Sequence, residues 1–338
     1  MVSFSGGRDS SAVLATAVDA ARREGLPPPV PVTIRFPDAP LTEEARWQER
    51  VISHLGLREW LKIDVAGGEM DLVGPLAIRI FERHGLVFPA NMAFVEATLK
   101  AAHGTCLLTG MGGDDLFVEW RWRELADALD GRRRVNQWDL LDAGYLFMPR
   151  RVRAALDRRY LKPPPPGWLR PQALDRARTA LSAERFGEPL RWGPWLRWCA
   201  GRVHLRAVKA AFELLAEDAG TRVAHPLLDP GFIAALGAAG GATGLGDRAT
   251  IMVDVFGDVL PEDVCRRPAK ATFGEVYWTD HSRAFARQWD GAGVDSDLVD
   301  PRALRREWSE PEPDTRSWLL LQSAWLAQHH VLPVATPA

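Results

Sequence analysis

Residues 5–11, with the sequence Ser-Gly-Gly-Arg-Asp-Ser-Ser, constrain the fold of this chain more than any other segment. They follow a short hydrophobic stub, residues 1–4, and precede apolar residues that recur at the three-to-four spacing of a helix. Two adjacent glycines allow a sharp turn and a close approach of the backbone to an anion. The N–H groups of such a turn and the N-terminus of the next helix attract phosphate. The segment therefore predicts a strand, a phosphate-binding turn and a helix that ends near Gly25.

The side chains of this turn suit a polyphosphate that carries a divalent cation. No Gly-Lys-Ser/Thr closes the turn, so it is not a Walker A loop. Asp9 is expected to bind Mg²⁺, because a carboxylate beside a polyphosphate would repel it unless a cation lay between them. The groups expected to bind phosphate are the backbone and hydroxyls of Ser5, Gly6, Gly7, Ser10 and Ser11.

Hydrophobic periodicity beyond this turn predicts an α/β fold. Residues 30–36, 59–65 and 105–109 have the pattern of strands, and residues 42–55, 71–84 and 91–102 that of helices. Such alternation predicts a parallel sheet with helices on both faces. A second glycine-rich turn follows the strand at 105–109. Because the carboxyl ends of parallel strands share one edge of a sheet, Asp9 and Asp114 are expected to meet there.

Three later blocks occur in the order of a known family. They are Leu108–Phe117, His225–Asp229, and Leu260-Pro261 followed by Arg266–Phe273. With residues 5–11, these blocks resemble the synthetase domain of asparagine synthetases and β-lactam synthetases, in the PP-loop ATP pyrophosphatase superfamily. The resemblance implies a parallel sheet flanked by helices and then a mainly helical C-terminal part. It also implies ATP and Mg²⁺ as cofactors.

The resemblance assigns roles to the later blocks. Asp9 and Asp114 correspond to the magnesium ligands, and Asp114 is also expected to be catalytic. Asp115 corresponds to an acidic residue of asparagine synthetases, although it could equally be the N-cap of a helix through residues 116–129. The further residues expected to bind the nucleotide are Gly110, Gly112, Gly113 and Asp115.

Lys270 is the second predicted catalytic residue. The chain has five lysines, and this one lies in an arginine-rich loop, which indicates a position where a compact point charge is needed. Its ammonium could neutralise charge on pyrophosphate and on a tetrahedral intermediate. An ordinary exposed lysine is the alternative interpretation. Arg266 and Arg267 either assist phosphate binding or are simply solvated loop residues.

Three departures from the family pattern qualify the resemblance. Residue 2 is Val, whereas asparagine synthetases begin with a glutaminase domain that has a catalytic cysteine at that position. We expect that domain to be absent from this sequence. A partner subunit could then supply the domain or the ammonia, or the true start could lie further upstream. Met111 stands where the family has Glu or Tyr, so the usual acid–base group is missing. Arg222 and Ala224 indicate an altered acceptor pocket.

The predicted function is an ATP-dependent amide-bond-forming ligase. A carboxylate would attack ATP to give an acyl-adenylate and pyrophosphate, and an amine would then displace AMP. The departures favour a cyclase or amidotransferase of specialised metabolism, of the β-lactam or lasso-peptide type. Three alternatives stay open: an asparagine synthase that uses ammonia from another source, a PP-loop enzyme that modifies tRNA, and a non-catalytic homologue that binds a nucleotide or peptide.

Composition and segment boundaries complete the expectations. With 46% hydrophobic and 25% charged residues, the chain has the make-up of a globular protein, and its net charge of −2 does not favour nucleic acid. We expect a cytoplasmic protein without a membrane segment, which acts on a small-molecule or peptide carboxylate and an amine. The expected parts are an ATP-binding core (1–130), a basic, proline-rich insertion (131–190) and a mainly helical part with the lysine loop (191–338).

Two groups of residues have more than one interpretation. The arginines between 132 and 159 are read as a solvated helical surface, with a docking face for a peptide, an acidic substrate or tRNA as the alternative. Trp192, Trp195 and Trp198 are read as packing residues rather than a ligand site. The three cysteines are too few and too scattered for a disulfide framework or a zinc site.

Overall fold

The computed structural model describes residues 1–42, 44–149, 151–153, 155–156, 166–268, 271 and 273–329. Its centre is a parallel sheet in the order β3-β2-β1-β4-β5. The strands are β1 (Val2–Ser3), β2 (Pro31–Arg35), β3 (Leu61–Asp64), β4 (Cys106–Leu108) and β5 (Arg222–Ala224). The predicted strands at 30–36, 59–65 and 105–109 are therefore confirmed, and so is the α/β class.

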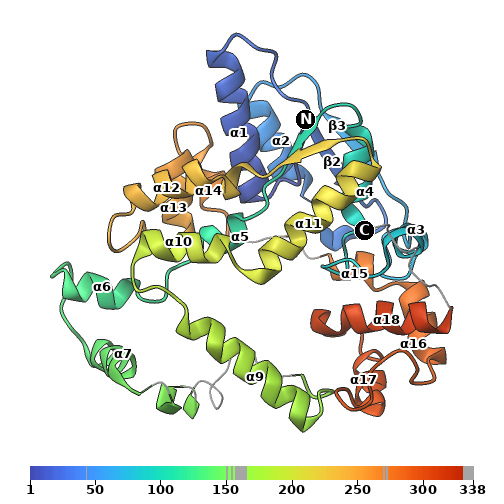
Figure 1. Cartoon of the computed structure of the whole chain (residues 1–338). Coiled ribbons are helices and arrows are strands. Elements are labelled where there is room, and N and C mark those ends of the chain that lie inside the picture. The colour runs from blue at the N-terminus through green and yellow to red at the C-terminus, as the bar shows by residue number, and fades with distance from the viewer. Residues whose placement is uncertain are drawn as a thin grey trace.

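Helices surround the sheet and make up most of the later chain (Figure 1). In the first part they are α1 (Arg8–Arg23), α2 (Ala45–His54), α3 (Pro75–His84), α4 (Phe94–Ala101), α5 (Gly113–Leu116), α6 (Arg123–Leu129) and α7 (Gln137–Phe147). Next come α9 (Pro171–Phe186), α10 (Trp192–Ala200), α11 (Val203–Asp218), α12 (Pro230–Ala239), α13 (Arg248–Phe256) and α14 (Glu262–Cys265). The last are α15 (Gly274–Tyr277), α16 (Asp280–Gln288), α17 (Pro301–Glu307) and α18 (Trp318–Gln328). Short 3-10 turns are η1 (Pro40–Thr42), η2 (Pro226–Leu228) and η3 (Thr315–Ser317).

The sheet separates two hydrophobic cores, as expected for a parallel sheet covered on both faces. Side chains that are adjacent along one strand enter different cores: Leu107 packs in one and Leu108 packs against the other. The first core is shared with α3, α4, α11 and the C-terminal helices, and the second with α1, α10 and α12 to α14. Alternation along β4 thus fixes which helices lie on each face.

Two details differ from the sequence-based expectation. The helix predicted through residues 116–129 is two helices, because α5 ends at Leu116 and α6 begins only at Arg123. Phe117 and Trp120 are fully buried in the irregular segment between them, so core packing overrides the helical pattern. In addition, β5 lies well beyond residue 130 and completes the sheet beside β4.

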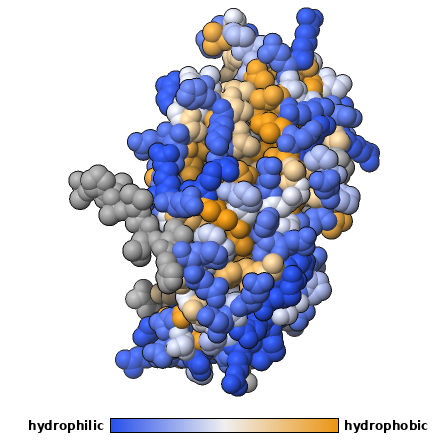
Figure 2. Space-filling model, turned by 90° about the vertical axis from the view of Figure 1, so that its right-hand side faces the viewer, coloured by the Kyte–Doolittle hydropathy of each residue, from blue (hydrophilic) through white to orange (hydrophobic). Residues whose placement is uncertain are grey.

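The tryptophan group has the predicted packing role. Trp192 and Trp195 stack with ring centroids 5.1 Å apart and are both buried. Two of the three cysteines are buried and all three are free thiols. On the side of the molecule that carries α3 and α16, hydrophilic side chains cover most of the surface and hydrophobic ones lie between them in smaller groups (Figure 2).

Candidate active site

The turn at residues 5–11 is held by its own hydroxyl groups. Ser5 Oγ accepts a hydrogen bond from the Gly7 N–H at 3.2 Å, and the hydroxyls of Ser10 and Ser11 donate to the Gly7 carbonyl at 3.0 and 2.8 Å. Gly6 has a φ of +86°, and a Cβ there would lie 2.8 Å from Gln48 Cγ, so only glycine fits. Helix α1 begins at Arg8 within this segment, with Gly7 as its N-cap, so the positive end of the helix lies at the turn.

The second glycine-rich turn packs directly against the first. A Cβ on Gly110 would lie 2.8 Å from the Ser10 nitrogen, and a Cβ on Gly113 would lie 2.2 Å from Asp9 Cγ. These distances leave no room for any side chain. The two turns are more than 100 residues apart in the chain, yet they touch. The expected convergence of the two turns at one edge of the sheet is confirmed.

One arginine binds both aspartates that this convergence brings together. Arg248, the first residue of α13, donates to both oxygens of Asp9 at 2.7 Å and to Asp114 Oδ1 at 2.7 Å. Burial disfavours its charged form, but the two carboxylates outweigh this and raise the pKa of Arg248. The carboxylates are therefore close enough to share one cation.

A buried ion pair attaches the arginine-rich loop to the first turn. Arg267 donates to the Gly6 carbonyl at 2.7 Å and to Glu44 Oε1 at 2.8 Å. Both side chains of this pair are almost fully buried, at 3% and 6% exposure. Glu44 also accepts a hydrogen bond from the Ala271 N–H at 2.7 Å. Arg267 is thus a structural clamp rather than a solvated loop residue, whereas Arg266 is half-exposed and pairs with Glu262.

A cavity of ≈390 Å³, here called the nucleotide cleft, lies where these parts meet. The residues that the sequence predicts for the site and that line this cleft are Ser5, Gly7, Asp9, Ser10, Gly110 and Asp114. Three arginines, Arg8, Arg248 and Arg267, also line it. Burial together with the nearby Arg248 charge lowers the pKa of Arg8. Positive side chains and an N-terminal helix end surround the cleft, which favours a polyanion.

The other predicted site residues lie behind or beside this cleft. Gly112 packs on Leu228, a residue of the His225–Asp229 block. Ser11 is fully buried and contributes to the turn's internal bonding. Lys270 lies outside the described residues, so its catalytic role stays a prediction.

Asp115 faces away from the cleft and has a partner on α11. His204 Nε2 lies 2.8 Å from its Oδ1, and Arg202 lies at 4.0 Å. The alternative role as N-cap of a helix through 116–129 is wrong, because Asp115 lies inside α5 and Gly112 occupies the N-cap position. Nucleotide binding by Asp115 stays a prediction.

The side of the cleft near Met111 is apolar and has a buried histidine behind it. Met111, Val208 and Phe212 line the cleft here. Behind them, His225 Nδ1 lies 2.7 Å from the Thr109 hydroxyl, and its ring packs on that of Phe212. Burial, with a smaller effect from Lys209, lowers the pKa of His225 to about 4. This histidine is therefore neutral at physiological pH.

Three contributors to the site carry no signal in the sequence. Arg248 reaches Asp9 across 239 residues and Asp114 across 134. Glu44 clamps Arg267, and Gln48 donates to the Ser5 carbonyl at 3.0 Å. Each is an ordinary polar residue of a helix or loop, and only the fold brings it to the turn.

Comparison with known proteins identifies the family. The family model for asparagine synthase matches residues 2–330 of the 338-residue chain. No curated protein matches the chain. None of the described helices combines the length and apolar character that crossing a membrane requires. With its parallel sheet, its two converging turns and this match over nearly the whole sequence, the chain belongs to the asparagine synthase family of ATP-dependent ligases.

Proposed function

We propose that this protein forms an amide bond by activating a carboxylic acid as its acyl-adenylate. A carboxylate oxygen of the acid attacks the α-phosphorus of ATP, and the bond from that phosphorus to the β-phosphate oxygen breaks to release pyrophosphate. An amine then attacks the acyl carbon, loses a proton and displaces AMP. The observation that carries this proposal is the direct contact of the two turns, with Asp9 and Asp114 bound to one cation, Arg248.

The donor set fits a magnesium ion that is shared with a polyphosphate. Two carboxylates meet here, and within the described part of the chain no third His, Cys, Asp or Glu joins a metal-binding group. Mg²⁺ in nucleotide sites takes one or two carboxylates and completes its shell with phosphate oxygens and water. When bound, the ion neutralises charge on the phosphates of ATP. Asp9 and Asp114 would hold it.

The residues of this chain supply position and charge rather than a nucleophile. The turn N–H groups and the N-terminus of α1 bind phosphate, and Arg8 and Arg248 lie where negative charge builds on the leaving pyrophosphate. The predicted role of Lys270 is the same. Alignment of two bound reactants provides much of the rate gain that such a reaction needs.

The departures at Met111, Arg222 and Ala224 support an acid or amine other than that of asparagine synthesis. Among the described residues, the walls of the cleft near Met111 are apolar, with Val208 and Phe212, so these walls offer no counter-charge to an ionised side chain such as that of aspartate. A specialised amidotransferase or cyclase is the role that we favour.

The test is acid-dependent exchange of labelled pyrophosphate into ATP. The purified protein is incubated with ATP, Mg²⁺, labelled pyrophosphate and each of a panel of acids, including aspartate. Exchange with at least one acid supports adenylation. Nucleotide binding measured by calorimetry without exchange for any acid contradicts it.

A further inference from the structure

A second cavity opens beside the nucleotide cleft. It has a volume of ≈1040 Å³, against ≈390 Å³ for the cleft. Pro89 and Asn91 line both cavities, so the two are neighbours that meet at this short segment between α3 and α4. The acyl-transfer chemistry proposed above uses none of the residues that line only the second cavity.

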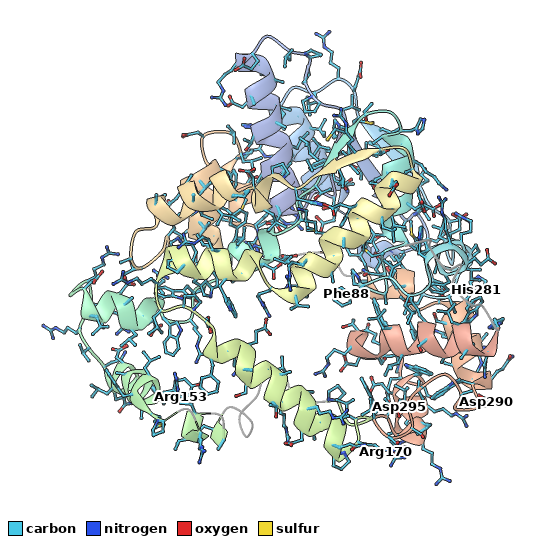
Figure 3. The ribbon with its side chains drawn as sticks, viewed as in Figure 1. Phe88, Arg153, Arg170, His281, Asp290 and Asp295 are labelled. Carbon is cyan, nitrogen blue, oxygen red and sulfur yellow. The ribbon has the colours of Figure 1, made fainter. Side chains whose placement is uncertain are left out.

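Aromatic side chains form much of the wall of this second cavity, which we call the aromatic cavity. Phe88, Phe273, Tyr277, Trp278 and Trp318 line it. Tyr277 and Trp318 contact each other with ring centroids 5.7 Å apart. Phe88 is 40% exposed, and Figure 3 shows it between α11 and α18. Tyr277, Trp278 and Trp318 are buried, so Phe88 and Phe273 provide most of the solvent-facing aromatic surface. Apolar and aromatic lining is typical of sites that bind apolar ligands.

Hydrogen bonds between separate segments hold these walls in place. Gln322 on α18 donates to the carbonyls of Ala90 and Leu72 at 2.7 and 2.9 Å, which fixes the segment that contains Phe88. Glu275 on α15 accepts the N–H of Leu41 at 2.8 Å. The cavity is therefore a preformed site rather than a loose gap between helices.

Asn91 is fixed at the junction of the two cavities. The Tyr277 hydroxyl, which is almost fully buried, makes a side-chain hydrogen bond with Asn91. The amide of Asn91 has two donor hydrogens and an acceptor oxygen, so it can also contact a carbonyl or carboxylate that passes the junction.

The charges at the rim of the aromatic cavity are largely engaged with protein partners. Arg316 donates to Asp314 at 2.9 Å, and Arg283 donates to the Pro311 carbonyl at 3.0 Å. Glu275, Glu312 and Asp314 also line the cavity, so among its described lining residues the carboxylates outnumber the arginines. The attraction that this cavity offers to a carboxylic acid is therefore mainly apolar contact with the body of the molecule.

We propose that the aromatic cavity binds the apolar body of the acid substrate while its carboxylate passes Asn91 into the nucleotide cleft. The substrate class is a carboxylic acid with an aromatic or long aliphatic group, free or as part of a peptide. An acid the size of aspartate would leave the cavity empty. This inference rests on the proposed function, because it places the acid of that reaction.

The test fills the cavity from Gly274, a lining residue at the start of α15. A Cβ on Gly274 would meet no atom of the described residues within 4 Å, so Gly274→Phe adds a ring without a clash against their backbone. The second variant is Phe88→Ala, and its matched control is Phe147→Ala, which removes an 89% exposed ring on α7. Thermal unfolding of each variant establishes that it is folded.

Two readouts separate this inference from the proposed function. Binding of N-acetyltryptophan is measured by calorimetry, and pyrophosphate exchange is measured with N-acetyltryptophan, N-acetylphenylalanine, dodecanoate and aspartate. We expect Gly274→Phe and Phe88→Ala to weaken binding, and to raise the KM of the apolar acids, roughly tenfold. The KM of ATP and the behaviour of Phe147→Ala should not change.

The outcomes are distinguishable. Two results would overturn the inference and leave adenylation intact. One is exchange with aspartate but with none of the apolar acids. The other is exchange with apolar acids whose KM is the same in both variants as in the original protein. A third result is that N-acetyltryptophan binds, that Gly274→Phe abolishes this binding, and that no acid supports exchange. It would support the cavity as an apolar site and contradict adenylation. Absence of both binding and exchange overturns both proposals.

Discussion

The nucleotide cleft and the aromatic cavity are neighbours built in opposite ways. Two compact motifs, residues 5–11 and 108–115, supply half of the residues that line the cleft, including its glycines and both carboxylates. The aromatic cavity takes its wall from three separated segments, near residues 88–91, 273–278 and 311–319, and none of them is a motif. Under the two proposals, the shared chemistry would depend on short local patterns, whereas the choice of substrate would depend on surfaces that only the fold assembles.

The largest expected difference between the nucleotide cleft and the aromatic cavity comes from substitution of Asp9, which should affect the cleft alone. Asp9→Asn removes one of the two converging carboxylates, and we expect pyrophosphate exchange to fall at least about a thousandfold, because the metal-bridged phosphates lose a ligand. N-acetyltryptophan binding to the aromatic cavity should stay within about twofold. Asp19→Asn, on the exposed side of α1, is the matched control. An Asp9→Asn protein with full exchange activity would contradict the assignment of the chemistry to the nucleotide cleft.

The buried clamp should matter for stability rather than for substrate choice. Glu44→Gln leaves Arg267 buried without its counter-charge, so the free energy of unfolding should fall by about 3 kcal/mol. Asp263→Asn, which breaks the half-exposed pair with Arg50, should cost less than about 1 kcal/mol. Urea denaturation measures both. Equal losses would show that the clamp is no stronger than a surface ion pair.

The contact between the turns can be disturbed by one methyl group. Gly113→Ala would place a Cβ 2.2 Å from Asp9 Cγ, so either the Asp9 carboxylate or one of the two turns must move. A displacement of this size at a catalytic centre can reduce the rate about a hundredfold. Gly144→Ala, where a Cβ meets nothing within 4 Å in the part of the chain that the structure describes, should leave exchange unchanged. Comparable exchange rates for the two variants would mean that the close approach is dispensable.

The smallest expected effect is a pH dependence from His225. Its pKa is lowered from 6.5 to about 4 by burial, so the unfolded chain binds a proton between these values that the folded chain does not. Stability should therefore fall as the pH drops from 6.5 to 4, by on the order of 2 kcal/mol, and should not depend on this group above pH 6.5. In a plot of the free energy of unfolding against pH, His225→Phe should reduce the slope between pH 4 and 6.5. The control His54→Gln, at an exposed site, should not. Parallel curves for the two variants would exclude His225 as the source.

Sequence reasoning reached the sheet and the two turns because both depend on local patterns. Glycine pairs after hydrophobic strands predict turns, and parallel strands bring such turns to one edge. The contact of Gly113 with Asp9 follows from that topology. The same reasoning failed for residues 116–129, where Phe117 and Trp120 are drawn into the core and interrupt the expected helix.

Long-range partners could not be predicted in this way. Arg248 and Glu44 are ordinary charged residues next to helix starts, and their partners lie more than 130 residues away in the chain. The partner of Asp115 is a histidine 89 residues later. Charge pairing of this kind has no periodicity, so it becomes visible only when the elements are placed in three dimensions.

Arg248 has a consequence for the order in which reactants bind. Its guanidinium binds both carboxylates of the cleft, and together with Arg8 it balances their two negative charges, so a lone divalent ion must compete with an internal counter-ion for Asp9 and Asp114. A triphosphate offers the displaced guanidinium a new anionic partner. We therefore expect metal and nucleotide to bind as one complex. As they bind, the Arg248 guanidinium would leave the two carboxylates and pair with the phosphates. Before they bind, it and Arg8 keep the charges of the cleft balanced.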